Sequence, residues 1–314
     1  MPVYHTAVTD RDHDFQQVWD LLTETHRPAR RQAPPAANYW SFCRFEGWMV
    51  FSAPPKGDRA GLTRKLHLWR ADAGRLIGLA IVEGNGCDVH VISDPDHREI
   101  EREIYTWVEA NWSTEENKWV TYAEAGDAHR EALLTGLGYR ARAEAEYLHV
   151  YDLTERSLNP TLPPGFSLSA AAEDGDHLGR ERLSWLVFRP GWDPAAMPEP
   201  VRQHMPSYDP ALDLVVVAPD GELVAFAAGW LNPRTQIAEV EPVGTHPAYR
   251  QRGLAKAVVT ECFRRLRERG ACWVHIASAP EPAVSNRLYQ SLGPVGRQRF
   301  VRWEREAGPQ IVRA

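Results

Sequence analysis

One hexapeptide, Arg250-Gln-Arg-Gly-Leu-Ala255, combines two cationic side chains with a glycine at the expected start of a helix. The first amides of a helix have no partner within the helix, and the helix dipole makes that end partly positive. Gly253 would let a ligand approach this backbone closely, while Arg250 and Arg252 add formal charge. Together these features predict a site for a phosphate or pyrophosphate. Taken alone, so short a glycine motif is equally compatible with an ordinary junction between a loop and a helix.

The hexapeptide follows a strand that ends at Thr245-His246-Pro247, and in this setting it resembles the acyl-CoA-binding motif of the GNAT superfamily of N-acetyltransferases. The resemblance implies that loop amides hold the pyrophosphate of coenzyme A. It also implies that the preceding strand separates from its neighbour and pairs with the pantetheine arm, with acetyl-CoA as the acyl donor. The residues it assigns to cofactor binding are Val243, Gly244, Thr245, Arg250, Gln251, Arg252, Gly253, Leu254, Ala255 and Asn286.

A second stretch, Ser285-Asn-Arg-Leu-Tyr289-Gln-Ser-Leu-Gly293, is also similar to the family pattern. Asn286 and Tyr289 lie three residues apart and so share a helical face. In the family an Asn here contacts the CoA arm and a Tyr protonates the departing thiolate, which implies that Tyr289 is the general acid. A tyrosine near the end of a helix is otherwise most often a packing residue. The chain departs from the pattern at Pro294, where the family often has an aromatic residue.

Acyl transfer from a thioester to an amine needs a neutral amine, a donor for the oxyanion and, less critically, an acid for the thiolate. The predicted oxyanion donor is a backbone amide near Val243. Glu239 and Glu241 share a strand face by the two-residue period, and either could be the base or an ordinary exposed carboxylate. We favour Glu239, because family members that use a strand glutamate place it four residues before this point. Glu241 is the alternative, since Pro242 could introduce a bulge.

Hydrophobic periodicity and turn residues predict the elements that would position these groups. The first half is expected to contain strands at 3–7, 66–70, 76–83, 87–92, 118–123 and 139–153, with helices at 11–24, 39–45, 97–111 and 128–137. The second half is expected to repeat this order. Its strands are expected at 166–169, 212–218, 223–231, 272–278 and 297–304, with a further strand that begins at Glu239. Its helices are expected at 174–188, 199–204 and 282–292, with a further helix that begins at Leu254.

This repetition predicts an α/β (mixed α+β) protein of two tandem GNAT-like modules. Each module is expected to be a mixed, mostly antiparallel sheet flanked by helices. The predicted division is an N-terminal module at 1–154, a linker at 155–164 and a C-terminal catalytic module at 165–314. The prolines of the linker can continue neither a helix nor a central strand.

The first module provides an internal control for the second. Aligning the two places Arg98 on Arg250, but puts Glu101 on Gly253 and a second glutamate two residues later. A carboxylate at that point would repel a pyrophosphate, so the first module is predicted to be degenerate and not to bind CoA. At the later helix the alignment pairs Glu131 with Asn286 and Leu134 with Tyr289.

The composition excludes some classes of protein. With 314 residues, 25% charged residues, 43% hydrophobic residues and a net charge of −6, the chain lacks the basic character of a nucleic-acid-binding protein. No apolar run has membrane-spanning length and the N-terminus does not resemble a signal peptide, which indicates no membrane partner and a cytoplasmic location. The cysteines lack paired or metal-like spacing, so we expect reduced thiols and no metal: Cys43, Cys87, Cys262 and Cys272.

The acceptor is predicted to be a primary amine of a small molecule, acetylated directly, since no serine lies in a nucleophile-elbow pattern. Its expected pocket lies between the loop at 189–208 and the cofactor strand, although its aromatic residues could equally be core: Trp192, Met197, His204 and Trp230. The alternatives are a catalytically silent acyl-CoA sensor and an acetyltransferase of protein or peptide amines. A monomer or homodimer is expected.

Overall fold

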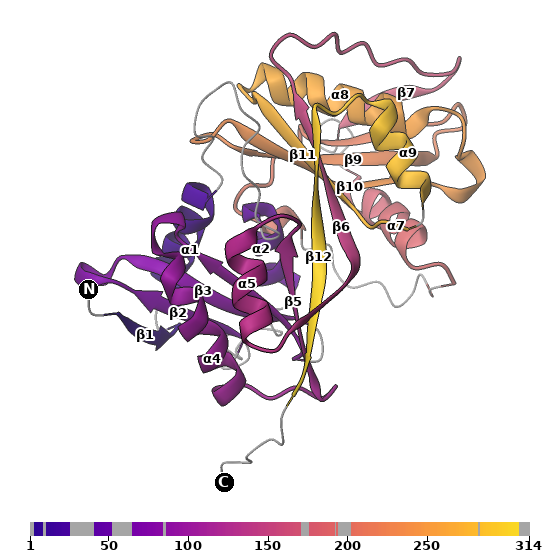
Figure 1. Ribbon diagram of the computed structural model, residues 1–314. Coiled ribbons are helices and arrows are strands. Elements are labelled where there is room, and N and C mark those ends of the chain that lie inside the picture. The colour runs from indigo at the N-terminus through magenta and orange to yellow at the C-terminus, as the bar shows by residue number, and fades with distance from the viewer. Residues whose placement is uncertain are drawn as a thin grey trace. The chain divides into compact units, whose positions relative to one another are not determined.

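The computed structural model describes residues 3–8, 11–25, 41–51, 65–83, 86–170, 176–191, 193, 202–281 and 283–307. The chain divides into two compact units (Figure 1). Unit 1 comprises Met1–Arg30, Pro35–Tyr147 and Gln298–Ala314, and unit 2 comprises Arg31–Pro34 and Leu148–Arg297.

Unit 1 is built on a mixed sheet in which β4 and β5 are parallel, whereas the pairs β1–β2, β2–β3, β3–β4 and β5–β12 are antiparallel. The strand order is β1 (Tyr4–Ala7), β2 (Leu66–Arg70), β3 (Leu76–Glu83), β4 (Asp88–Ser93), β5 (Lys118–Glu124) and β12 (Gly296–Glu306). The helices are α1 (Arg11–Thr25), α2 (Phe42–Phe51), α4 (Glu101–Asn111) and α5 (Ala128–Gly136), with 3-10 turns η1 (Asp72–Gly74) and η2 (Pro95–Ile100).

Alternation along β3 explains why helices cover both faces of this sheet. Ala80 belongs to a cluster that contains Ile104 of α4, whereas the preceding residue, Leu79, belongs to a cluster that contains Leu22 of α1. Successive side chains of a strand point to opposite faces. A strand that is apolar at nearly every position therefore needs a helix on each side.

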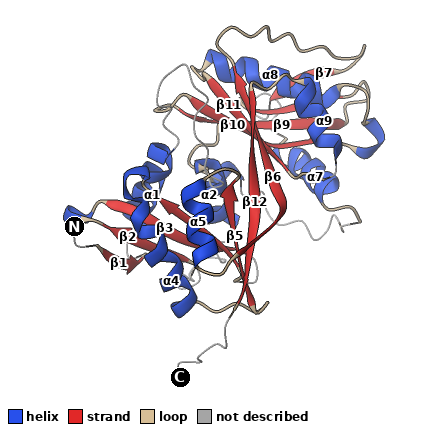
Figure 2. Ribbon diagram, in the orientation of Figure 1, coloured by secondary structure: helices blue, strands red, loops and turns tan. Residues whose placement is uncertain are grey.

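Unit 2 repeats this plan (Figure 2). Its strand order is β6 (Arg140–Asp152), β11 (Trp273–Ser278), β10 (Ile237–Thr245), β9 (Leu223–Asn232), β8 (Asp213–Val217) and β7 (Ser167–Ala170). Its helices are α7 (His177–Phe188), α8 (Leu254–Glu268) and α9 (Ala283–Ser291), with 3-10 turns η4 (Arg202–His204) and η5 (Pro247–Tyr249).

The two faces of the unit 2 sheet differ in their partners. On β9, Ala225 and Ala227 join the cluster formed with Val258 of α8, while Phe226 joins the cluster formed with Leu183 of α7. Alpha8 therefore packs on one face and α7 on the other. Any group on β10 lies between these two layers.

The boundaries of the two compact units differ from those of the modules predicted from the sequence repeat. The chain enters unit 2 within β6, at Leu148, and returns to unit 1 within β12, at Gln298. The reason is the pairing of β12, which runs antiparallel to β5 from Phe300 to Glu306. The predicted modules, 1–154 and 165–314, stay a proposal about the repeated sequence rather than about compact units.

The predicted order of elements agrees with the structure, and two boundaries are corrected. Helix α4 begins at Glu101 rather than at residue 97, because residues 95–100 form a 3-10 turn in which His97 has φ −130° and ψ 32°. Helix α2 runs from Phe42 to Phe51 and so continues beyond the predicted 39–45. Among the described residues, no helix is both long and apolar enough to cross a bilayer.

Candidate functional site

The start of α8 is open backbone without a side-chain cap. Gly253 precedes the helix with φ 80° and ψ 0°, a left-handed conformation in which a side chain would be strained. As a glycine, the N-cap residue has no side chain that could accept from the first amides, and a Cβ built on it would meet no described residue within 4 Å. Gln251 also has a positive φ, of 63°. The first amides of α8 therefore face open space, as an anion-binding helix start requires.

Two arginines of the same loop remain at the surface. Arg250 and Arg252 are exposed, and they donate long hydrogen bonds, at 3.4 Å, to the carbonyls of Thr245 and Ala248 respectively. The Arg252 guanidinium also lies over the Tyr249 ring, with its Cζ 4.9 Å from the ring centroid. Guanidinium groups held this weakly can turn toward an anion at the helix start. His246 instead supports the loop, since its Nδ1 accepts from the Ala248 amide at 3.2 Å.

Strands β10 and β11 pair over only part of their length. The parallel ladder joins Ile237, Ala238 and Glu239 to Trp273, Val274 and His275. Beyond Glu239, β10 continues to Thr245 in register with β9 alone. Its side toward β11 thus carries backbone groups that the ladder does not use. Such an edge can bind an extended ligand through its amides and carbonyls.

The same segment of β10 contains an irregularity at the predicted position. The register with β9 shifts between Val240 and Val243, on either side of Pro242. The Trp230 indole donates to the Glu241 carbonyl at 2.5 Å and anchors the irregular segment. Trp230 is only 2% exposed, so its observed contact is with the strand.

The two candidate bases differ in environment. Glu239 is half-buried and lies between Trp230 on β9 and His275 on β11, at the last pair of the parallel ladder. Glu241 is exposed. The structure therefore places Glu239 where the strands begin to separate, and Glu241 beyond that point.

Tyr289 lies on α9 with its side chain 7% exposed. Burial raises the pKa of its hydroxyl, and the negative charge of Glu241 raises the pKa further. This phenol therefore stays protonated at any physiological pH and could act only as a proton donor or hydrogen-bond donor. Its backbone carbonyl accepts from the Tyr151 hydroxyl at 2.9 Å, which ties α9 to β6.

Asn286 is engaged with its own loop. Its Nδ2 donates to the carbonyls of Ala279 and Pro280 at 2.9 and 3.0 Å, and its Oδ1 accepts from the Ser278 hydroxyl at 2.8 Å. The structure thus shows Asn286 closing the turn between β11 and α9. Its predicted contact with CoA stays a prediction.

Sequence reasoning missed His149, which completes this network. Its Nε2 lies 3.0 Å from Ser278 Oγ and 3.3 Å from Asn286 Oδ1, and its ring centroid lies 5.4 Å from that of Tyr289. Burial lowers the pKa of His149, which favours the neutral ring. Because Asn286 Oδ1 can only accept, a neutral His149 would carry its proton on Nε2. Only its place in a predicted strand was visible in the sequence.

The predicted acceptor residues are only partly placed. Trp192 and Met197 lie outside the described residues. His204 is exposed at the end of η4, and Trp230 is buried under β10. The pocket that these four residues were predicted to form stays a prediction.

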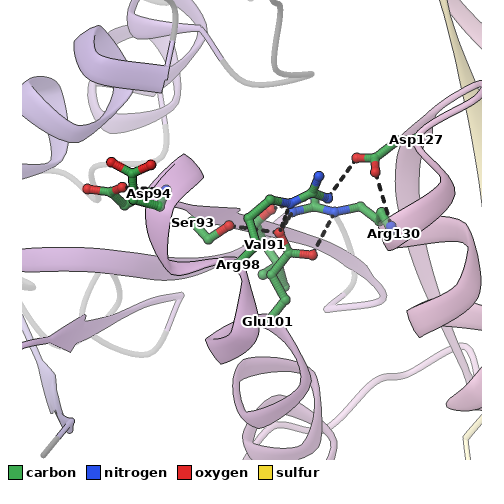
Figure 3. Close-up of polar contacts among 8 residues, drawn as sticks. Val91, Ser93, Asp94, Arg98, Glu101, Asp127 and Arg130 are labelled. Atoms are coloured by element: carbon green, nitrogen blue, oxygen red, sulfur yellow. Dashed lines mark hydrogen bonds and ion pairs between the residues drawn. The ribbon is translucent and has the colours of Figure 1, made fainter. Parts of the chain in front are cut away.

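The corresponding site in unit 1 is filled by its own side chains (Figure 3). Glu101, the first residue of α4, is fully buried, and it accepts from Ser93 Oγ at 2.7 Å and from Arg98 Nε at 3.0 Å. Arg130 on α5 pairs with it at 2.8 Å and also donates to the Val91 carbonyl of β4 at 2.9 Å. Burial tends to raise the pKa of Glu101, but Arg130, Ser93 and Arg98 outweigh this and lower the pKa to about 2.

Comparison with known proteins agrees with this geometry. Residues 180–293 match the acetyltransferase (GNAT) family. Over this segment the chain is similar to GNAT acetyltransferases. The match includes β10, the Gly253 loop, α8 and α9. The mixed fold predicted from the sequence is confirmed by solved structures of GNAT proteins.

Three relatives show how far the likeness extends. A mycothiol acetyltransferase of Nocardiopsis dassonvillei is 31% identical over 105 residues, which cover 31% of this chain and 30% of that protein. A tandem GNAT protein from the clavulanic acid biosynthesis pathway has a TM-score of 0.66 at 18% identity, covering 98% of this chain and 100% of the other. A GCN5-related N-acetyltransferase from Sphaerobacter thermophilus has a TM-score of 0.63 at 20% identity, covering 98% and 97%. At these identities the two structures show the fold alone.

Proposed function

We propose that this protein is an acetyl-CoA-dependent N-acetyltransferase that transfers an acetyl group directly to a primary amine of a small molecule. The reaction is assigned to unit 2. One observation carries the proposal: an uncapped helix start at Gly253 directly follows a strand edge that is free beyond Glu239. The first feature fits a pyrophosphate and the second fits an extended amide-containing arm. The match of residues 180–293 to acetyltransferases supports the same assignment.

The residues of the chain fit acetyl-CoA by charge and by space. The open position above Gly253, with Arg250 and Arg252 beside it, suits the diphosphate. Backbone groups of Val243, Gly244 and Thr245 on β10 would hold the arm. Gln251, Leu254 and Ala255 would contribute loop and first-turn amides, and Asn286 would shape the turn beside the thioester.

Each catalytic role follows from an environment described above. Glu239, half-buried where the strands separate, would take the proton of the amine directly or through water. An amide near Val243 would stabilise the oxyanion. Tyr289, whose pKa burial raises, would give its proton to the thiolate. Glu241, whose charge also raises the pKa of Tyr289, would help keep that proton in place and is the alternative base.

The test measures free CoA by chromatography after incubation of acetyl-CoA with a panel of primary amines. We expect amine-dependent CoA release, and we expect Glu239→Gln to lose the acidic limb of the kcat/KM profile. Glu241→Gln is the matched control and should keep that limb. If Glu241→Gln alone lost it, the base would be reassigned to Glu241.

A second candidate is an acyl-CoA sensor, favoured by the engagement of Asn286 within its own loop. Tight binding of acetyl-CoA by calorimetry, without CoA release from any amine or peptide in the panel, would select the sensor. Release with peptides but not with small amines would assign a protein or peptide acceptor instead.

A further inference from the structure

Arg180 on α7 is a buried guanidinium with two unused nitrogens. Its side chain is 2% exposed, and its Nε donates to Asp213 Oδ1 at 2.8 Å. Its Nη1 and Nη2 are buried and meet no acceptor among the residues that the structure describes. Asp213 and the Phe226 ring compensate part of the cost of burying this charge, but the N–H groups of Nη1 and Nη2 have lost water without gaining a hydrogen bond. The edge formed by Nη1 and Nη2 therefore points to a missing acceptor.

This edge lies close to the strand at which transfer is proposed. The Arg180 Cζ stands 4.0 Å from the centroid of the Phe226 ring. Phe226 is the register partner of Gly244 on β10, and a Cβ at Gly244 would lie 2.3 Å from the tip of that ring. A single aromatic ring thus separates the guanidinium from the β10 backbone beside Val243.

A second set of contacts leads from Arg180 to the same strand. Asp213 Oδ2 accepts from the Tyr208 hydroxyl at 3.3 Å, and the Tyr208 ring lies 6.1 Å from that of Trp230. Trp230 in turn donates to the Glu241 carbonyl. These residues lie on the α7 face of the sheet, opposite α8, which carries the proposed diphosphate site. The acceptor would therefore approach β10 from the side of Arg180.

A neighbouring arginine, Arg202, also has a buried N–H group without a hydrogen-bond acceptor among the described residues. Within the described part of the chain, Arg202 on η4 has a buried Nη1 without an acceptor, and its Nη2 lies 3.6 Å from Glu181 Oε2, beyond ordinary hydrogen-bond distance. Formal charges in this cluster balance, since Asp213 and Glu181 oppose the two arginines. Donors nevertheless exceed acceptors. A carboxylate supplies two oxygens in the plane and at the spacing that a guanidinium fork matches.

We propose that the acceptor of unit 2 carries a carboxylate in addition to its amine, and that this carboxylate binds the Nη1–Nη2 edge of Arg180. The inference rests on the proposed acetyl transfer, because it assigns the other end of the same acceptor. The substrate class is an amino acid or a longer amino carboxylate, with its amine at β10 and its anionic group at α7.

Pairs of amines that differ only at the carboxyl group test this inference. The probes are glycine, β-alanine and 4-aminobutyrate, each against its primary amide. For the pair of suitable length, we expect kcat/KM for the carboxylate to exceed that for the amide by about 10-fold or more, as for a hydrogen-bonded charged group. Thermal stability is measured with the same probes at constant ionic strength, so that binding is read without turnover.

Arg180→Lys keeps the charge but removes the fork. In this variant the ratio of kcat/KM for the carboxylate to kcat/KM for the amide should fall to within about twofold of unity. Arg182→Gln, an exposed position on the same helix, is the matched control and should keep the preference. If Arg180→Lys does not fold, the ratio of kcat/KM for carboxylate and amide in the wild-type protein still tests the proposed carboxylate site.

The outcomes separate the two proposals. CoA release that is equal for acid and amide in every pair, or a preference that survives in folded Arg180→Lys, overturns the carboxylate site and leaves water as the partner of Arg180. Stabilisation by a carboxylate in wild type, absent in Arg180→Lys and without CoA release, supports the site and refutes the acetyltransferase. If no probe stabilises the protein and no probe causes CoA release, the inference of an amino carboxylate acceptor is overturned.

Discussion

The starts of α4 and α8 stand at matching positions of the two repeats and are completed in opposite ways. At α4 the carboxylate of Glu101 is fully buried and is held by Arg98 and Arg130. At α8 the matching residue is Gly253, above which there is open space, and Arg250 is exposed. The start of α4 is thus occupied by a carboxylate of the chain itself, whereas the start of α8 offers amides and an exposed arginine to a ligand.

The comparison extends to the strands before these helices. In unit 1, Arg130 donates to the Val91 carbonyl of β4, and the rings of His90 and Tyr122 stack between β4 and β5 at 5.4 Å and 7°. In unit 2, the edge of β10 beyond Glu239 has no ladder partner on β11. The difference suggests that unit 1 has replaced a bound anion by an internal carboxylate, and has turned a binding site into a structural ion-pair network.

The largest effect is expected on stability, when the buried carboxylate of Glu101 is removed. Glu101→Gln removes the charged partner of the largely buried Arg130, whereas Arg98 keeps Asp127, and should lower the unfolding free energy at pH 7 by about 3–5 kcal/mol. Urea denaturation, followed by hydrogen exchange of α4 amides so that unit 1 is read separately, measures it. Glu99→Gln on the exposed turn before α4 is the control and should change stability by less than about 0.5 kcal/mol.

The pH dependence of that effect has a defined sign. The pKa of Glu101 is about 2 in the folded protein against an ordinary value of 4.5. Its stabilising contribution is therefore complete above pH 4.5 and is lost as the pH falls through 2. The difference in unfolding free energy between wild type and Glu101→Gln should therefore become smaller as the pH falls from 4.5 to 2. A gap that stayed constant down to pH 2 would mean that the carboxylate is not the stabilising group.

The next effect is expected from copying unit 1 into unit 2. Gly253→Glu places a carboxylate where the diphosphate is proposed to bind, and should weaken acetyl-CoA binding by about 100-fold through repulsion and steric exclusion. Calorimetric titration measures the affinity.

Its matched control is Gly270→Glu at the other end of α8. Gly270 has φ +94° and, like Gly253, has nothing within 4 Å of a Cβ. Both variants add the same charge and impose similar backbone strain, so both should lose similar stability. Only the Gly253 variant should lose affinity. Equal losses of affinity in both would remove the loop from the binding site.

Much of this arrangement is local and could be predicted from the sequence. A glycine beside two arginines at a helix start, and Asn286 three residues before Tyr289, are features of short segments. The order of strands and helices likewise follows from hydrophobic periodicity. The replacement of Gly253 by Glu101 in the first repeat was visible without any structure.

The remaining features depend on residues distant in sequence. Arg180 and Asp213 lie 33 residues apart, and His149 and Asn286 lie 137 apart. No pattern in the chain indicates that Nη1 and Nη2 of Arg180 would be buried without acceptors, since that depends on the packing of α7 against β8 and β9. The return of β12 to unit 1 was missed for the same reason, because strand pairing is not encoded in a local period.

A smaller effect is expected from Tyr289, for which unit 1 has Leu134. Tyr289→Phe should lower kcat by about 10- to 100-fold and leave acetyl-CoA affinity unchanged, because a phenol supplies a proton only during thiolate departure. Steady-state kinetics and calorimetry separate the two quantities. Tyr122→Phe in unit 1 is the control and should keep kcat. An unchanged kcat in Tyr289→Phe would assign this tyrosine to packing.

The smallest effect concerns the residue that the two repeats use in different ways. Asn286 donates to the carbonyls of Ala279 and Pro280, whereas Glu131 at the matching position accepts from the Gly126 amide at 2.9 Å. Both side chains close the turn before a helix, with opposite hydrogen-bond polarity. Asn286→Ala should therefore lower the unfolding free energy by about 1–2 kcal/mol through loss of these bonds.

The same variant decides whether Asn286 also contacts the donor. If it only closes the turn, acetyl-CoA affinity should fall by less than about threefold, and Asn286→Asp, which cannot donate to either carbonyl, should be at least as destabilised. Urea denaturation and calorimetry on the two variants and on Glu131→Ala give the comparison. A loss of affinity of about 10-fold or more in Asn286→Ala, with stability unchanged, would instead show that its amide leaves the loop to bind coenzyme A.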